Sequence, residues 1–117
     1  MPNSRPTTSA DKLTSCILAE DPDFLDIVQD FVRGLDVRFQ ELQSAYERLD
    51  WAELRMLAHR LKGAGASYGY PDLTRLAAHL ESSFKAERAD DFADRLRELR
   101  TLADAARRGL PGAVTQE

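Results

Sequence analysis

A histidine followed by a lysine and two glycines marks the part of the chain best suited to chemistry. In AHRLKGAGASYGY, residues 58–70, His59 precedes Lys62 and Gly63, and Gly65 follows. A neutral imidazole is a competent nucleophile at physiological pH, and a nearby ammonium group would neutralise an anion attached to it. Each glycine costs a helix about 1 kcal/mol relative to alanine. The segment therefore predicts a phosphoryl-carrying histidine that another protein approaches closely.

Helix geometry indicates that His59 faces outward. At about 100° per residue, the apolar positions of residues 54–68 fall in one stripe, which is the predicted core face. His59 lies about 150° from the centre of that stripe and Gly63 about 170° from it. Lys62 and Ala66 lie on the same flank as His59. An exposed histidine alone indicates no function, but the adjacent lysine and the otherwise costly glycine favour a site.

Four amphipathic helices, with apolar residues every three or four positions, are predicted to position this segment. The first spans Phe24 to Leu49 behind a cap at Asp21-Pro22. Gly34 lies inside it and could mark a bend, but the apolar stripe continues past this residue in phase. These positions are expected to face the core.

The other three helices follow after short connections. The second begins at the cap Asp50 and stops at Gly69, and the third begins at Pro71. The fourth follows a cap at Asp90 and runs to Ala106. A shorter helix around residues 13–19 is expected to cover one end.

The fold class predicted from these elements is all-α. No segment alternates with a period of two, and short connections between long helices favour antiparallel neighbours. We therefore expect an antiparallel up-down-up-down four-helix bundle with a short N-terminal covering helix. The expected organisation is a flexible lead-in at residues 1–10, the bundle at 11–108 and a flexible tail at 109–117.

Composition limits the classes of function. A length of 117 residues fits one domain, and a net charge of -4 argues against nucleic-acid binding. The single cysteine, Cys16, excludes an internal disulfide and is expected to be a small buried apolar group. The sequence has neither a membrane-spanning apolar run nor a secretory signal. A cytoplasmic, monomeric protein without a membrane partner is the expectation.

The sequence AHRLKGAGASYGYPDLTRLAAHLE, residues 58–81, resembles the signature of histidine-containing phosphotransfer (HPt) domains. That signature has a histidine, an aliphatic residue, Lys-Gly, a later glycine, and a leucine-rich helix ending in Leu-Glu. The matching residues are His59, Leu61, Lys62, Gly63, Gly69, Leu73, Leu76, Leu80 and Glu81. The resemblance extends over about residues 20–106, which is nearly all of the predicted bundle.

The resemblance implies a phosphoryl carrier rather than an enzyme. His59 would accept a phosphoryl group on Nε2 from the aspartate of one receiver domain and pass it to another. Lys62 would stabilise the phosphoryl charge, while Arg55, Gly63 and Ala66 would form the surface on which the receiver docks. The receiver would supply Mg²⁺, so the chain would need no cofactor or metal of its own and have no autokinase activity.

Glu81 is a candidate for orienting the His59 ring. If the second and third helices are antiparallel, both residues lie about 15 Å from the connecting turn and are level. In the related domain of chemotaxis kinases, a glutamate of this Leu-Glu pair hydrogen-bonds the histidine. Those kinases often have a second histidine where this chain has Ala78, so His79 is expected at the bundle boundary. His59 and His79 alone do not define a zinc site.

Two other functions stay open. The chain resembles the histidine substrate domain of chemotaxis-type kinases, although the missing second histidine favours a receiver-to-receiver relay. A non-catalytic helical adaptor is the other alternative, although both His59 and Lys62 are kept. A kinase dimerisation helix fits poorly, because there an acidic residue and then Thr-Pro follow the histidine, whereas Arg60-Leu61-Lys62-Gly63 follows here.

Overall fold

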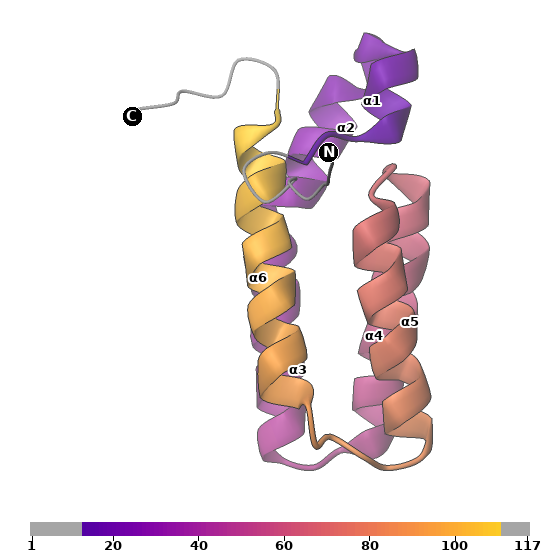
Figure 1. Cartoon of the computed structure of the whole chain (residues 1–117), viewed down its shortest axis with the longest axis vertical. Helices are drawn as coiled ribbons and strands as arrows, with labels where there is room; N and C mark the ends of the chain where they lie inside the picture. Colours follow the sequence, from indigo (N-terminus) through magenta and orange to yellow (C-terminus); the bar gives the residue numbers. More distant parts are fainter. Residues whose placement is uncertain (1–12, 111–117) are drawn as a thin grey trace, which may run out of the picture.

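The computed structural model describes residues 13–110, and every regular element within that range is a helix. The prediction of an all-helical fold is confirmed. The predicted lead-in at residues 1–10 lies outside the described residues, as do residues 111–117 of the predicted tail. The elements are α1 (Cys16–Glu20), the 3₁₀ turn η2 (Pro22–Phe24), α2 (Leu25–Arg33), α3 (Leu35–Glu47), α4 (Trp51–Ser67), α5 (Pro71–Lys85) and α6 (Phe92–Arg108) (Figure 1).

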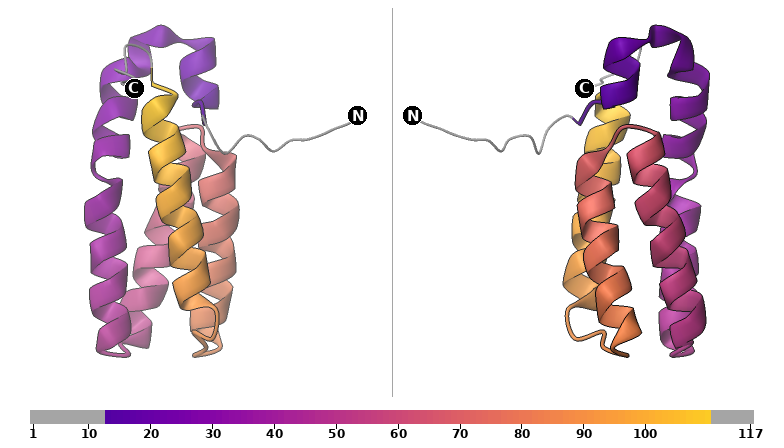
Figure 2. Two further views of the ribbon diagram at one scale, coloured as in Figure 1. Left: turned by 60° about the vertical axis from the view of Figure 1, so that its left-hand side comes forward. Right: turned by 90° about the vertical axis from the view of Figure 1, so that its right-hand side faces the viewer.

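The long helices α3, α4, α5 and α6 lie alongside one another, and the chain direction reverses from each to the next (Figure 1). Helices α4 and α5 pack together most extensively and form a hairpin. Helix α6 packs against α3 and α5. Helices α1 and α2 form an arch over one end of the bundle (Figure 2). The segment with His59 therefore belongs to the hairpin of α4 and α5.

Apolar side chains from α2 to α6 form one core. Burial of each leucine or phenylalanine contributes about 1.5–3 kcal/mol. Aromatic rings link distant elements: Tyr46 of α3 stacks on Phe92 of α6 at 4.5 Å between centroids, and Phe31 of α2 stacks on Tyr68 at 4.6 Å. The largest fully buried side chains include Phe39, Leu54, Leu61, Leu73, Leu80, Phe84 and Leu99.

The first predicted helix is divided at Gly34. Helix α2 ends at Arg33 and α3 begins at Leu35, with the Gly34 N–H donating to the carbonyls of Asp30 and Phe31. The apolar stripe stays in phase, so buried positions continue on both sides of the break. Its two ends were predicted wrongly, because Phe24 and Leu49 are exposed. Phe24 ends the 3₁₀ turn, and Leu49, with a φ of 51°, belongs to the turn before α4.

The predicted starts of the later helices are only partly correct. The Asp50 carboxylate accepts the Glu53 N–H at 3.1 Å, which confirms the cap of α4, and Pro71 occupies the first turn of α5 as predicted. For α6 the cap prediction was wrong, because the N-cap is Asp91 rather than Asp90 and its carboxylate does not bond the helix backbone. That carboxylate instead binds His79.

The N-terminal segment, residues 13–20, is fixed across the end of the bundle. The Leu13 N–H donates to the Ala105 carbonyl at 2.9 Å, and the Cys16 N–H donates to the Gly69 carbonyl at 2.8 Å. The buried Ser15 hydroxyl donates to the Tyr68 carbonyl at 2.6 Å and caps α1. These bonds join the segment to α6 and to the turn between α4 and α5.

Two further expectations concern this end of the molecule. The prediction that Cys16 is buried was wrong: its backbone contacts the turn while its thiol is exposed. Of the predicted tail, Gly109 and Leu110 are described. Gly109 lies against the Leu13 backbone, where a Cβ would collide, and Leu110 packs on the core. None of the helices within residues 13–110 is long and apolar enough for a membrane crossing.

Candidate functional site

His59 stands on the outward face of α4. Its side chain is 67% exposed, whereas Ala58 and Leu61 on the same helix are buried in the core. This is the orientation that the helical periodicity predicts. The ring is therefore open to an approaching molecule and makes little contribution to the core.

Glu81 of α5 reaches across the hairpin to the His59 ring. Its Oε2 lies 2.9 Å from His59 Nδ1, so the two residues are level, as the antiparallel arrangement predicts. An ionised carboxylate only accepts hydrogen bonds, so Nδ1 carries the proton and donates it. In the neutral ring Nε2 then keeps its lone pair. The contact fixes both the tautomer and the direction of the ring.

The same carboxylate binds Lys62. Its Oε1 lies 2.6 Å from Lys62 Nζ, and the glutamate side chain is only 13% exposed. The hydrogen bond from Lys62, and secondarily that from His59, lowers the pKa of Glu81 below its usual value despite partial desolvation. Glu81 is therefore a carboxylate at neutral pH. Glu81 thus connects Lys62 to the His59 ring, and this connection was not predicted from the sequence.

The face of α4 that is predicted to dock a partner, called the docking face below, consists of Arg55, His59, Gly63 and Ala66. All four residues are exposed, and their spacing of three or four places them in one row along the helix. A Cβ built on Gly63 would have no atom within 4 Å, so the backbone is open one turn beyond the histidine. The structure thus brings the predicted docking residues to one surface around the imidazole.

Gly65 faces the opposite way and sets the distance between the two helices. A Cβ there would lie 2.7 Å from Thr74 Oγ1 and 2.9 Å from the Thr74 nitrogen. The Thr74 hydroxyl donates to the Lys62 carbonyl at 3.1 Å. This close approach lets Glu81 reach His59. Thr74 was not predicted from the sequence, although the register that makes residues 59 and 81 level also makes residues 66 and 74 level.

His79 lies outside this site. Its Nε2 is 2.9 Å from Oδ2 of Asp91, which also accepts from Arg95 Nε at 3.1 Å. These bonds, with His79 contributing most, lower the pKa of Asp91. The histidine links α5 to the start of α6, in line with the boundary position expected for it. Residues 13–110 contain no cluster of three or more potential metal ligands.

The arrangement combines an exposed imidazole, a carboxylate on one ring nitrogen and an ammonium group bound to that carboxylate. A protein-family model described as Hpt domain matches residues 26–109, which include α3 to α6, all but the first residue of α2, and every residue of the site. The resemblance noted in the sequence is thereby confirmed. No curated protein and no solved structure gives a significant match.

Proposed function

Because the chain belongs to the family of histidine-containing phosphotransfer domains, which carry phosphoryl groups in phosphorelays, we propose that His59 is its phosphoryl acceptor. The group arrives from an aspartate of one receiver domain and leaves to an aspartate of another. The observation that carries the proposal is the exposed His59 ring, whose Nδ1 is held by Glu81 so that Nε2 is left for the phosphoryl group.

For the fold we propose a four-helix, up-down-up-down bundle in which α2 and α3 together form the first helix.

The transfer step needs no proton to be removed from the histidine. The Nε2 lone pair attacks the phosphorus of the aspartyl phosphate, and a P–N bond forms as the P–O bond breaks. The aspartate carboxylate leaves with the electron pair of that bond. The imidazole ring, still protonated at Nδ1, becomes positively charged, and the Glu81 carboxylate stabilises that charge. Delivery to a second aspartate reverses these changes.

Lys62 is the proposed partner of the phosphoryl oxygens. Its ammonium group is bound to the carboxylate that holds the ring, so it is within a side-chain movement of Nε2. Phosphoryl transfer depends mainly on positioning and charge neutralisation, and these can be divided between two proteins. The Mg²⁺ is proposed to sit on the receiver, and we propose no cofactor for this chain.

The test is transfer from a radiolabelled receiver domain. Receiver domains from the genome that encodes the chain are phosphorylated with labelled acetyl phosphate, separated from the donor and mixed with the chain. The expected product is an acid-labile, alkali-stable label that maps to His59. Absence of label with every receiver, or label on another residue, would reject the relay and favour the helical adaptor.

A second candidate is the histidine substrate domain of a chemotaxis-type kinase. The bond between Glu81 and His59 Nδ1 favours it, because it resembles the glutamate–histidine bond of that related domain. Incubation with ATP and the catalytic domains of such kinases separates the two: labelling from ATP but from no receiver would favour this candidate. ATP alone is expected to give no label, since the proposed carrier has no autokinase activity.

Glu81→Gln is expected to slow phosphoryl acceptance by roughly 10- to 100-fold, by analogy with the loss of the group that orients a metal-binding histidine. The amide oxygen can still accept from Nδ1, but it does not stabilise a positive ring or bind Lys62. Single-turnover transfer measures the rate, and ring ¹⁵N shifts of His59 report the tautomer. A wild-type transfer rate, or a slower rate that coincides with loss of the fold, would contradict the orienting role.

The stability difference between wild type and Glu81→Gln is expected to depend on pH. The folded pKa of Glu81 lies below its ordinary value of 4.5, so its ion pairs stabilise the fold fully above that pH. This contribution is lost as pH falls through the lowered folded pKa, where the protonated side chain resembles glutamine. The difference in free energy of unfolding between wild type and Glu81→Gln should therefore shrink in acid. Urea titrations at several pH values measure it, and a constant difference would contradict the ion pairs.

A further inference from the structure

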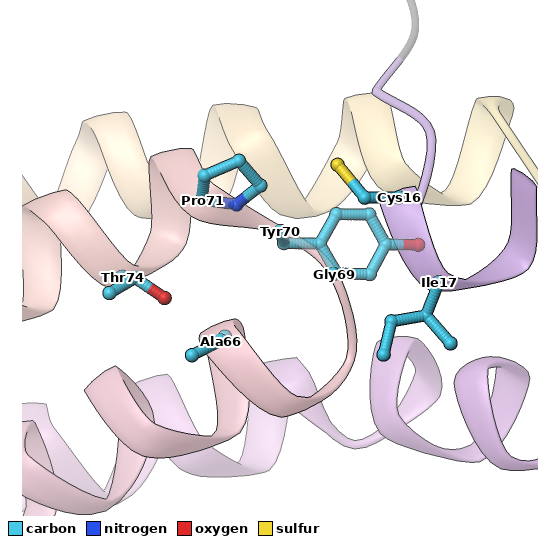
Figure 3. Close-up of a pocket in the computed structure, with 8 residues that line it drawn as sticks. Cys16, Ile17, Ala66, Gly69, Tyr70, Pro71 and Thr74 are labelled. Carbon is cyan, nitrogen blue, oxygen red and sulfur yellow. The ribbon is translucent and has the colours of Figure 1, made fainter. Parts of the chain in front are cut away.

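A cleft of about 320 Å³ lies between the N-terminal segment and the hairpin of α4 and α5 (Figure 3). Cys16 and Ile17 form one side of it, and Ala66 and Thr74 come from the two hairpin helices. The Tyr70 ring lines it as well, and burial raises the pKa of this tyrosine to about 12, so the phenol stays uncharged. The lining is mostly apolar.

The cleft opens next to the docking face. Ala66, which lines it, follows His59 by seven residues, which is two helical turns with an offset of about 20° and a rise of about 10 Å. A small transient interface covers about 600 Å² per partner, which corresponds to a disc of roughly 14 Å radius. A partner centred on His59 Nε2 therefore covers the mouth of the cleft.

The wall formed by the N-terminal segment is held rigidly. The Ser15 hydroxyl and the Cys16 N–H bind the carbonyls of Tyr68 and Gly69. Gly69 has a φ of 83°, and a Cβ there would lie 2.6 Å from the Ile17 nitrogen. Only glycine allows this approach, so the cleft is a built feature of the turn.

The opposite side of the docking face is cationic. Arg55 precedes His59 by one turn, and Lys85 follows Glu81 by one turn, so the hairpin register places them level with each other. Both are exposed, and neither has an ion-pair partner within residues 13–110. The chain as a whole has a net charge of -4, so these cations are a local exception. Such a surface attracts a partner whose reacting aspartate lies among other carboxylates.

We propose that a receiver domain inserts an apolar side chain into this cleft while its aspartate reaches His59. The N-terminal segment is then part of the docking surface, and the cations on the other side of His59 fix the orientation of the receiver. This inference rests on the function proposed above and adds to it where on the chain the partner is recognised.

The chain's single cysteine provides the test, since Cys16 is exposed at the cleft. Pyrenyl-maleimide attaches a large group there, and methyl methanethiosulfonate attaches a small one. The large adduct is expected to raise the receiver concentration for half-maximal transfer at least tenfold, and the small adduct much less. Phosphorylation of His59 by phosphoramidate, a small donor that needs no docking, should be unchanged.

A matched control moves the cysteine to another face. Cys16→Ser combined with Ala93→Cys places the same large adduct on an exposed position of α6, which packs against α3 and α5. The adduct is expected to leave transfer to this variant unchanged relative to the same variant without the adduct. An equal loss at both positions would overturn the inference, because the label would then act without regard to the cleft.

Protection of Cys16 from alkylation tests the same inference in a chain that carries no bulky adduct when the receiver binds. Saturating receiver domain should slow alkylation of Cys16 in His59→Gln, and should not slow it at the Ala93→Cys control. Unprotected Cys16 together with normal transfer to the large adduct would overturn the inference while leaving the proposed function intact. Failure of every receiver to label the unmodified chain would instead overturn the proposed function. An adduct that changes only self-association would assign the cleft to a second copy of the chain and also overturn the inference.

Discussion

His59→Gln is expected to abolish phosphoryl acceptance from any receiver while leaving the fold unchanged. The glutamine amide nitrogen has no available lone pair, so no nucleophile is left at the position of Nε2. The wild-type side chain is 67% exposed, and exposed substitutions change stability by about 0.5 kcal/mol or less. Thermal unfolding beside a radiolabel transfer assay measures both effects. A large fall in melting temperature would show that the ring supports the core.

The other histidine supplies a matched control for this prediction. His79→Gln makes the same chemical change but removes a ring that binds Asp91 instead of Glu81. It is expected to keep phosphoryl acceptance near the wild-type level and to lose a little stability where α5 meets α6. Loss of acceptance in His79→Gln with retention in His59→Gln would reverse the assignment of the acceptor.

Gly65→Ala and Gly63→Ala are expected to change stability in opposite directions. At Gly65 a methyl group would lie 2.9 Å from the Thr74 backbone nitrogen, which cannot rotate away, so α5 must shift. Overpacking of this kind costs roughly 1–3 kcal/mol. At Gly63 the methyl group meets no atom within 4 Å, and the helix gains about 1 kcal/mol from the better helix former. Urea denaturation of the two variants measures the difference.

The two glycines are also expected to differ in how they affect transfer. A shift of α5 in Gly65→Ala moves Glu81 away from His59, so the ring ¹⁵N shifts should show a mixture of tautomers. Gly63→Leu should leave the ring unchanged but impair transfer from receivers, because its side chain stands in the docking face. Phosphoramidate should still label Gly63→Leu at the wild-type rate. Normal transfer from receivers to Gly63→Leu would contradict a close approach there.

Local patterns in the sequence predicted much of the fold and the direction of His59. The cap at Asp50 and the helix start at Pro71 are properties of a few adjacent residues, and the structure has both. The level positions of His59 and Glu81 followed from counting residues on either side of one short turn. Such features depend on backbone geometry alone, which is why the sequence was sufficient for them.

Features that depend on tertiary contacts were not predictable in this way. The division of the first helix at Gly34 does not disturb the apolar stripe, so periodicity cannot detect it. Cys16 is exposed because its backbone, rather than its thiol, is used by the turn at Gly69. Asp91 rather than Asp90 is the N-cap of α6, and its carboxylate binds a histidine of α5 instead of the helix backbone.

The shared carboxylate of Glu81 has a consequence for the energetics of a phosphoryl carrier. Lys62 Nζ lies 2.6 Å from it, so a phosphate on Nε2 would share that ammonium group with Glu81. The attraction gained on loading would then be partly offset by a weaker ion pair. The phosphorylated and unphosphorylated forms of the carrier would thus stay close in free energy. Phosphoryl transfer would then be readily reversible with either partner.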